Sequence, residues 1–236
     1  MFKVKVLILA GGKGTRLLPY TAVLPKPLMP IDEKPILEII IRQLKKYGIN
    51  EIFISVGYMA GLIETFFGNG DRYGVSITYL METEPLGTAG PVALLPDFDS
   101  TLLMMNGDVL TSMNFLDMVS HHKENRAAMT IGMTTQLYQN PLGYVEHDEH
   151  NVITKYVEKP VYQYDVSMGI YAMEPEILAS VEKGKRLDIP DLVNILIANK
   201  KKVIGYPSSD YWLDMGKHEE YNKVNDDFKK HKASFL

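Results

Sequence analysis

Residues 4–56 alternate between strand and helix patterns, and this alternation restricts the fold more than any other feature of the chain. Val4–Ala10 is a continuous apolar run with β-branched residues, which is typical of a strand buried on both faces. Pro35–Gly48 places its isoleucines on one side of a helix and most of its charges on the other, and Glu51–Val56 is a second apolar run. A strand, a helix and a strand in this order predict two parallel strands joined by a right-handed crossover.

The alternation continues as far as residue 123 and then changes character. The short strands after this point are separated by turns, which is typical of antiparallel pairing. We therefore predict an α/β fold with a doubly wound, Rossmann-like mixed sheet flanked by helices and a small antiparallel subregion, in one domain over residues 1–236. Helices are expected at 59–67, 87–95, 115–123, 175–182, 189–199 and 217–230, and strands at 75–80, 101–106, 127–134, 143–147, 152–157, 167–173 and 202–206.

Composition excludes several classes of protein. With 46% hydrophobic and 23% charged residues, the 236-residue chain suits an ordinary globular domain. The absence of cysteine excludes disulfides, thiolate metal sites and cysteine nucleophiles. A net charge of −4 with interspersed signs argues against a nucleic-acid surface, and no apolar run approaches the ~18 residues of a membrane span. We expect a cytoplasmic protein with no signal peptide and with no nucleic-acid or membrane partner.

The segment after the first strand is rich in glycine and basic residues, but it fits neither common phosphate-binding loop. A dinucleotide loop would need a third glycine where Leu17 stands, and a P-loop would need Gly-Lys-Ser/Thr. Glycines at the end of a buried strand still let backbone N–H groups approach an anion. Arg16 adds a guanidinium suited to phosphate oxygens, and Lys26 stands between Pro25 and Pro27, which are expected to hold the backbone extended. The segment therefore predicts an anion-binding turn.

Two aspartates come directly after apolar segments. Asp108 lies just beyond the strand predicted at 101–106, at the same sheet edge as the glycines, and Asp214 lies just beyond the single tryptophan in YWLD. Carboxylates at a strand edge suit Mg²⁺, which takes few protein ligands and completes its shell with water and phosphate oxygens. Aspartate is also common as a helix cap or a turn residue, so the residues alone leave both interpretations open.

Seven motifs are spread over most of the chain. The longest is LILAGGKGTRLLPYTAVLPKPLMPI at 7–31, and the others are EPLGTAG (84–90), NGDVL (106–110), GYVE (143–146), VEKP (157–160), GIY (169–171) and WLDMG (212–216). In this order they resemble the sugar-1-phosphate nucleotidylyltransferase family, of the mannose-1-phosphate guanylyltransferase-like type. The resemblance implies that the protein catalyses the reaction of a nucleoside triphosphate with a sugar 1-phosphate to give an NDP-sugar and pyrophosphate. It places nucleotide binding at about 1–110 and sugar-phosphate binding at about 111–236.

The resemblance also implies roles for single residues. The expected catalytic residues are Arg16, Lys26 and Lys159, and the expected Mg²⁺ ligands are Asp108 and Asp214. The expected nucleotide-binding residues are Leu9, Ala10, Gly11, Gly12, Gly14, Thr15, Glu82, Glu84, Gly87 and Thr88. The expected sugar-phosphate-binding residues are Asn106, Gly143, Glu158, Lys159, Ser167 and Gly169.

The base and the sugar are less constrained. The segment YLMETEPLGTAG has Glu82 and Glu84 but no glutamine, and a carboxylate can accept two neighbouring N–H groups of guanine, whereas an amide suits uracil or thymine. We therefore expect GTP, and the resemblance to guanylyltransferases implies a GDP-mannose or GDP-heptose product. The alternatives are a UTP- or dTTP-using glucose-1-phosphate enzyme and a non-catalytic nucleotide-sugar-binding regulatory subunit. Ser167 stands where many family members have asparagine, so the identity of the sugar stays open. The oligomeric state also stays open, with a homodimer as one possibility.

Overall fold

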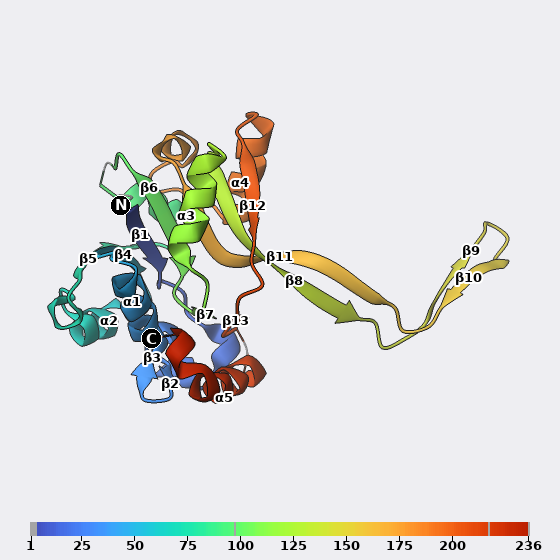
Figure 1. Cartoon of the computed structure of the whole chain (residues 1–236), viewed down its shortest axis with the longest axis horizontal. Coiled ribbons are helices and arrows are strands. Elements are labelled where there is room, and N and C mark those ends of the chain that lie inside the picture. Colours follow the sequence, from blue (N-terminus) through green and yellow to red (C-terminus); the bar gives the residue numbers. More distant parts are fainter. Residues whose placement is uncertain (1–3, 97, 217, 236) are drawn as a thin grey trace.

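The computed structural model describes residues 4–96, 98–216 and 218–235, and its centre is a seven-stranded mixed sheet in the order β12-β8-β11-β6-β1-β4-β5 (Figure 1). The sheet contains β1 (Val4–Leu9), β4 (Glu51–Val56), β5 (Ser76–Met81), β6 (Thr101–Asn106), β8 (Met129–Gln139), β11 (Val161–Met173) and β12 (Val203–Pro207). The helices are α1 (Ile36–Lys46), α2 (Ala60–Phe67), α3 (Phe115–Glu124), α4 (Ile189–Ala198) and α5 (His218–Phe235). Three two-stranded pairs join β2 (Pro30–Ile31) to β3 (Lys34–Pro35), β7 (Val109–Thr111) to β13 (Trp212–Asp214), and β9 (Tyr144–His147) to β10 (Ile153–Val157). The predicted mixed α/β sheet is confirmed.

The parallel half of the sheet is built around β1. This strand pairs in parallel with β4 on one side and with β6 on the other. From β1 the chain passes outward through β4 to β5 and then returns to the opposite side of β1 as β6. In open α/β sheets such a reversal leaves a crevice at the carboxyl ends of the strands, and ligands bind there.

Helices cover both faces of the sheet, because the central strand is apolar on both sides. Val6 and Ile8 belong to one buried cluster with the apolar faces of α1, α2, α3 and α5. Leu7, which points to the opposite face, belongs to a second cluster with α4. None of these three β1 side chains has exposed surface. The sheet therefore holds the carboxyl end of β1 in a fixed position.

The antiparallel half differs from the expectation of short strands. β8 and β11 run well past the predicted strands 127–134 and 167–173 and pair with each other from Met173–Met129 out to Val161–Gln139. Beyond the sheet they form, with β9 and β10, a two-stranded arm over residues 134–166 that projects far from the body of the molecule (Figure 1). The arm makes no core, so its strands carry no continuous apolar run from which the sequence could reveal their length.

Two predicted helices are short 3₁₀ segments instead. The structure has Gly90–Leu94 in place of 87–95 and Pro175–Ser180 in place of 175–182, and each has a proline in its first two positions. The last predicted helix is α5, which continues to Phe235, whereas its predicted first residue, Lys217, lies outside the described residues. Among the helices of the described residues, none has the length and apolar character needed to cross a membrane.

Candidate active site

The glycine segment after β1 forms one wall of a pocket. Gly14 has a φ of +61°, in the left-handed region, and a Cβ added there would stand 2.9 Å from Cγ2 of Thr21. A Cβ on Gly11 would stand 2.5 Å from Oε1 of Glu82. A side chain at position 14 would strain the backbone, and one at position 11 would displace the carboxylate of Glu82, so the loop favours glycine at both positions.

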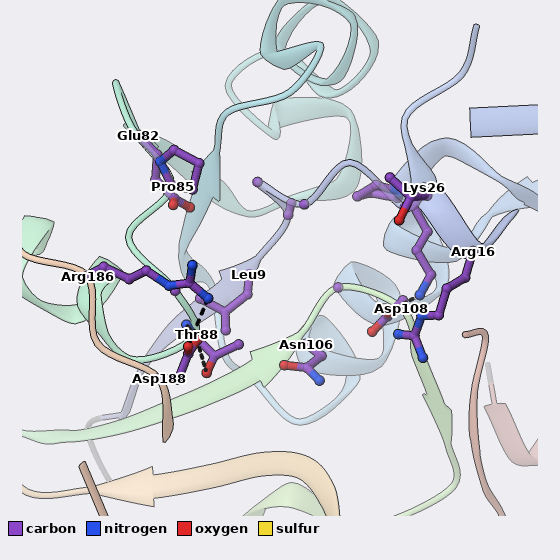
Figure 2. Close-up of a pocket in the computed structure, with 18 residues that line it drawn as sticks. Leu9, Arg16, Lys26, Glu82, Pro85, Thr88, Asn106, Asp108, Arg186 and Asp188 are labelled. Carbon is purple, nitrogen blue, oxygen red and sulfur yellow. Dashed lines mark hydrogen bonds and ion pairs between the residues drawn. The ribbon is translucent and has the colours of Figure 1, made fainter. Parts of the chain in front are cut away.

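The pocket has a volume of about 450 Å³ and lies at the carboxyl ends of β1 and β6, where the strand order reverses (Figure 2). The predicted site residues that line it are Leu9, Ala10, Gly11, Gly12, Gly14, Thr15, Arg16, Lys26, Glu82, Gly87, Thr88, Asn106 and Asp108. The lining residues that the sequence did not predict are Pro27, Pro85, Gly107, Arg186 and Asp188. The polar side chains gather at two ends of the pocket, which Figure 2 shows on its right and left.

One end carries a buried cation between two carboxylates. Lys26 is 9% exposed, and its ammonium group forms an ion pair with Asp108. The same nitrogen lies 3.8 Å from Oδ1 of Asp214. Arg16 lines the same end but is exposed, so its guanidinium is free to turn toward a ligand. This end of the pocket is suited to a polyanion.

The backbone at Lys26 departs from the predicted extended conformation. Pro25 is extended, with ψ of 143°, but Lys26 is the first residue of a 3₁₀ turn, Lys26–Leu28. The N–H of Met29 donates to the carbonyl of Lys26 at 3.0 Å and closes this turn. The turn buries the side chain of Lys26 and directs its ammonium at the carboxylates, so the prolines position the lysine by a different geometry from the one predicted.

Asp108 and Asp214 are brought together by pairing of β7 with β13, and the N–H of Met215 donates to the carbonyl of Asp108 at 3.1 Å. The Oδ1 atoms of both aspartates are buried and have no hydrogen-bond partner. Burial, and then the charge of Asp108, raise the pKa of Asp214 to about 6, although Lys26 opposes this rise. Partnerless buried carboxylate oxygens fit a divalent cation, which would favour the ionised form of both groups.

The carboxylate pair is a sparse ligand set. The described residues contain no cluster of three or more His, Cys, Asp or Glu side chains placed to hold a metal ion. Mg²⁺ tolerates such a set, because it keeps several waters and takes phosphate oxygens from the substrate. The pair therefore suits Mg²⁺ held jointly with a bound triphosphate, and the assignment of Asp108 and Asp214 as ligands stays a prediction.

The other end of the pocket joins the segment after β5 to the start of α4. The N–H of Thr88 donates to Oδ1 of Asp188 at 3.0 Å, and the N–H of Ile189 donates to Oγ1 of Thr88 at 2.8 Å. Arg186 pairs with Oδ2 of Asp188 at 3.0 Å. The N–H of Thr88, with help from Arg186, holds the pKa of Asp188 below its usual range. A carboxylate thus stays ionised at this end.

The two glutamates of the predicted base-reading segment are placed differently. Glu82 lines the pocket, but its oxygens already accept hydrogen bonds from the hydroxyl of Ser55 at 2.5 Å and from the N–H of Leu86 at 3.0 Å. Glu84 is exposed and is not among the residues that line the pocket. Glu82 therefore holds its segment against the glycine loop, and Asp188 is the second carboxylate at this end.

Three of the predicted sugar-phosphate residues lie together beside the pocket. Asn106 lines it, and Nδ2 of Asn106 is 2.6 Å from the position that a Cβ on Gly169 would take. The N–H of Gly169 donates to the hydroxyl of Ser167 at 3.2 Å. A shift in the β8–β11 register between Ser167 and Tyr171 creates this irregular stretch of β11. Ser167 and Gly169 therefore border the pocket through Asn106 without lining it.

The remaining predicted sugar-phosphate residues lie on the arm, away from the pocket (Figure 1). The hydroxyl of Tyr156 donates to Oε2 of Glu158 at 3.0 Å, and a Cβ on Gly143 would stand 2.8 Å from the same oxygen. Lys159 is the next residue, with a φ of +44°. The structure thus brings together most of the predicted nucleotide side of the site, but it does not bring Gly143, Glu158 or Lys159 to the pocket of the same chain.

Residues 5–231 match the nucleotidyl transferase family. The chain is 34% identical over 226 residues to a mannose-1-phosphate guanyltransferase of Schizosaccharomyces pombe, and 32% identical over 237 residues to a UTP–glucose-1-phosphate uridylyltransferase of Synechocystis. Each alignment covers 92% of this chain but only 62% and 61% of the respective relative, so the chain spans about three fifths of the length of these relatives.

Solved structures show the same fold. A Bacillus anthracis chain in complex with sucrose, assigned as a glucose-1-phosphate thymidylyltransferase, superposes with a TM-score of 0.77 and 25% identity, over 95% of this chain and 94% of that chain. HddC from Yersinia pseudotuberculosis superposes with a TM-score of 0.74 and 23% identity, over 97% of this chain and all of that one. Since the family match extends over almost the whole chain, this protein belongs to the nucleotidyl transferase family.

Proposed function

We propose that this protein transfers a nucleotidyl group from a nucleoside triphosphate to a sugar 1-phosphate and releases pyrophosphate. The observation that carries the proposal is the pocket at the β1–β6 crevice, which combines a glycine loop with the buried Lys26 and the Asp108–Asp214 pair at one end. Membership of the nucleotidyl transferase family and the names of its relatives support the same reaction.

In this reaction an oxygen of the sugar phosphate attacks the α-phosphorus in line, and the bond from that phosphorus to the bridging oxygen of pyrophosphate breaks. The nucleophile is already anionic at neutral pH, so the site needs no general base. Catalysis then depends on positioning and on neutralising charge. Backbone N–H groups of the loop at Gly11 and Gly12 bind phosphate oxygens, and Lys26 and Arg16 balance the charge of the departing pyrophosphate.

Mg²⁺ bound to the carboxylate pair would neutralise phosphate charge and orient the triphosphate. Asp108 and Asp214 each offer it a buried oxygen with no hydrogen-bond partner. Lys26 reduces the electrostatic repulsion between the two carboxylates, since its ammonium group contacts Asp108 and lies 3.8 Å from Oδ1 of Asp214.

For the base we propose guanine. Two carboxylates, Glu82 and Asp188, line the end of the pocket opposite Lys26. Each of their oxygens already has a partner in the protein, and the lone pairs left free can accept an N–H of guanine. Relatives named mannose-1-phosphate guanylyltransferases, from yeasts and from Mycobacterium tuberculosis, are 30–34% identical. The second candidate is a UTP- or dTTP-using enzyme for glucose 1-phosphate, which is favoured by the relative of that type at 32% identity.

A grid of five nucleoside triphosphates against mannose, heptose and glucose 1-phosphates, read as pyrophosphate release, tests this proposal. We expect the highest kcat/KM with GTP and mannose or heptose 1-phosphate, and loss of the signal with EDTA. Preference for UTP or dTTP would overturn the base assignment. Nucleotide binding without pyrophosphate release would instead indicate a regulatory subunit.

The role of Lys26 is tested within the same assay. Lys26→Ala removes the buried cation, and we expect kcat to fall by about 100-fold or more, as when one group that stabilises transition-state charge is removed. Lys13→Ala is the matched control, because Lys13 is an exposed lysine of the same loop that does not line the pocket. Equal rates in the two variants, with the circular dichroism of both unchanged, would contradict the assignment.

A further inference from the structure

Two residues that are expected to bind the sugar phosphate lie on the arm, outside the pocket. Glu158 and Lys159 stand on it, yet neither lines the pocket of their own chain. Among the residues that do line that pocket, the cations are Arg16, Lys26 and Arg186, and the last two are already paired with carboxylates. Arg16 is assigned to the departing pyrophosphate, so these lining residues leave no separate cation for the incoming sugar phosphate.

The arm is not arranged to fold back on its own body. β8 and β11 pair without interruption from Ser167–Met133 out to Val161–Gln139, so the arm leaves the sheet as a continuous ribbon. The bases of both strands are fixed, because β8 also pairs with β12 and β11 also pairs with β6. Returning Lys159 to its own pocket would require a sharp bend that breaks these ladders.

The surface of the arm is unusually apolar for a segment surrounded by water. Ten of its large apolar side chains are exposed. The most exposed, at 56–71% of their surface, are Leu137, Leu142, Val152, Ile153, Tyr156 and Val161. An isolated two-stranded ribbon is marginally stable in water, and an exposed apolar patch of this size marks an interaction surface.

The body exposes three large apolar side chains in the segment that follows the glycine loop. Leu18, Tyr20 and Val23 are 51%, 50% and 76% exposed, and they come soon after Thr15 and Arg16, which line the phosphate end. Apolar surface is therefore available both on the arm and beside the pocket. If the ribbon packed its apolar side chains on this part of the body, Lys159, at the junction between β10 and β11, would come to the phosphates.

We propose that the arm docks into the pocket of a second copy of this chain, so that two chains exchange arms and each active site takes Lys159 from its partner. This inference rests on the proposed function, because it gives Lys159 the sugar 1-phosphate as its ligand. The exchange is reciprocal, as in a two-fold dimer in which each chain uses the same surface. Lys159 then supplies the missing cation for the nucleophile.

Reach and area agree with this arrangement. From residue 134 to residue 139 the ribbon extends about 17 Å at ~3.3 Å per residue, and Lys159 lies just beyond its far end, two residues before Val161. A body of this size has a radius of gyration of about 17 Å, so Lys159 can reach a neighbouring pocket. Neighbouring side chains such as Leu137 and Tyr138 point to opposite faces of the ribbon, so one docked face buries about half of the ten. At on the order of 100 Å² for each side chain, two arms bury about 1,000 Å² of their own surface and a similar area of the two bodies, and this total suffices for a stable dimer.

The backbone at Lys159 gives independent support. Its φ of +44° is in the left-handed region, which a lysine rarely adopts. Such conformations cost about 1–3 kcal/mol and are concentrated at functional sites. The strain falls on the residue that the exchange delivers to the substrate, and asparagine, which tolerates this conformation, is a suitable replacement for testing the charge.

Complementation between two inactive variants tests the exchange. Lys26→Ala damages the pocket, and Lys159→Asn damages the arm while keeping the left-handed backbone. After co-refolding of equal amounts, half of the dimers are mixed, and each mixed dimer holds one intact site, so we expect about a quarter of the wild-type activity. Activity no greater than that of the single variants would overturn the exchange. Lys155→Ala, on the same hairpin, is the control and should leave activity unchanged.

Cross-linking provides a measurement that needs no activity. The chain has no cysteine, so Lys13→Cys on the glycine loop and Lys155→Cys on the arm introduce one defined pair. With a bis-maleimide, the double variant should give a product of twice the chain mass, and either single variant should not. A product that stays at the mass of one chain, or no cross-link at all, would overturn the proposal.

The two measurements also separate this inference from the proposed function. An intermolecular cross-link in a protein that releases no pyrophosphate with any substrate pair would support the exchange and refute the activity. An active wild-type protein that shows neither complementation nor an intermolecular cross-link would support the activity and refute the exchange.

Discussion

Adjacent glycines in the loop have different surroundings, and this difference predicts two different defects. A Cβ on Gly11 would stand 2.5 Å from the carboxylate of Glu82, whereas a Cβ on Gly12 meets nothing within 4 Å. We expect Gly11→Ala to lower the free energy of unfolding by about 1–3 kcal/mol through overpacking. Gly12→Ala should leave stability within about 0.5 kcal/mol of wild type but raise the KM for the nucleotide, because its methyl group enters the pocket.

Urea unfolding and steady-state kinetics of the two variants check this contrast. Gly12→Ala acts as the control for Gly11→Ala, since both change a glycine of the same loop to the same residue. Equal stability of the two variants would show that the loop yields at Gly11, and an unchanged KM in Gly12→Ala would remove this residue from the nucleotide site.

Single residues also show how far the sequence could predict the site. Loop and strand-end residues were predictable, because the residues directly after a buried strand must lie at one edge of the sheet. Arg186 and Asp188 were not predictable, since they lie in an irregular segment before α4. Asp188 is 100 residues from Thr88 in the sequence, and only the folded chain brings the two together. Asp188, followed by Ile189 and Pro190, does predict the start of a helix, but this pattern gives no reason to expect Asp188 in a pocket. Glu84 was predicted beside the base and is exposed, because alternation along an irregular segment does not fix which way a side chain points.

At the scale of whole elements, His122 ties α3 to the sheet and predicts a pH-dependent stability. Its Nδ1 lies 2.7 Å from Oγ1 of Thr130 on β8, and its Nε2 lies 3.1 Å from Oε1 of Glu174, just after β11. Burial lowers the pKa of His122, although Glu174 opposes this shift. The unfolded chain therefore binds a proton more readily than the folded one. The stability from neutral His122 is complete above the unfolded value of 6.5 and is lost as the pH falls toward the lower folded pKa.

We therefore expect the unfolding free energy of the wild type to fall more steeply than that of His122→Gln as the pH is lowered from about 7 to 5. The difference in slope cannot exceed about 1.4 kcal/mol per pH unit, the value for one proton. Urea titrations at several pH values measure it, with His121→Gln on the same helix as the control. Parallel curves for wild type and His122→Gln would mean that the imidazole does not titrate differently in the two states.

The bounds of a strand or helix could be predicted best where most of its side chains are buried in the core. β1, β4 and β6 were found because buried parallel strands are apolar throughout. β8 and β11 were underestimated because only their basal halves lie in the sheet, and along the arm polar and apolar residues alternate with no core to explain them. The sequence contained the strand signal, but it did not show that the arm would be covered by none of the residues that the structure describes.

For the molecule as a whole, arm exchange makes stability depend on protein concentration. Replacing residues 140–160 by Asn-Gly closes β8 and β11 with a two-residue hairpin turn and leaves the body intact. We expect the Tm of the wild type to rise with protein concentration, because assembly stabilises the folded state by mass action, and the Tm of the shortened variant to stay constant. Calorimetry over a hundredfold range of concentration measures both. Sedimentation should show a dimer and a monomer respectively, and concentration-independent melting of the wild type would contradict the exchange.

The single tryptophan lies where the two halves of the site meet. The indole N–H of Trp212 donates to the carbonyl of Met168 at 2.8 Å, next to Gly169, and Trp212 is two residues before Asp214. Its emission depends on the polarity and hydrogen bonding around the ring, and no other tryptophan contributes a background. The intrinsic fluorescence of this one indole can therefore test, without any label, whether a metal ion, a nucleotide or a sugar phosphate binds, one ligand at a time.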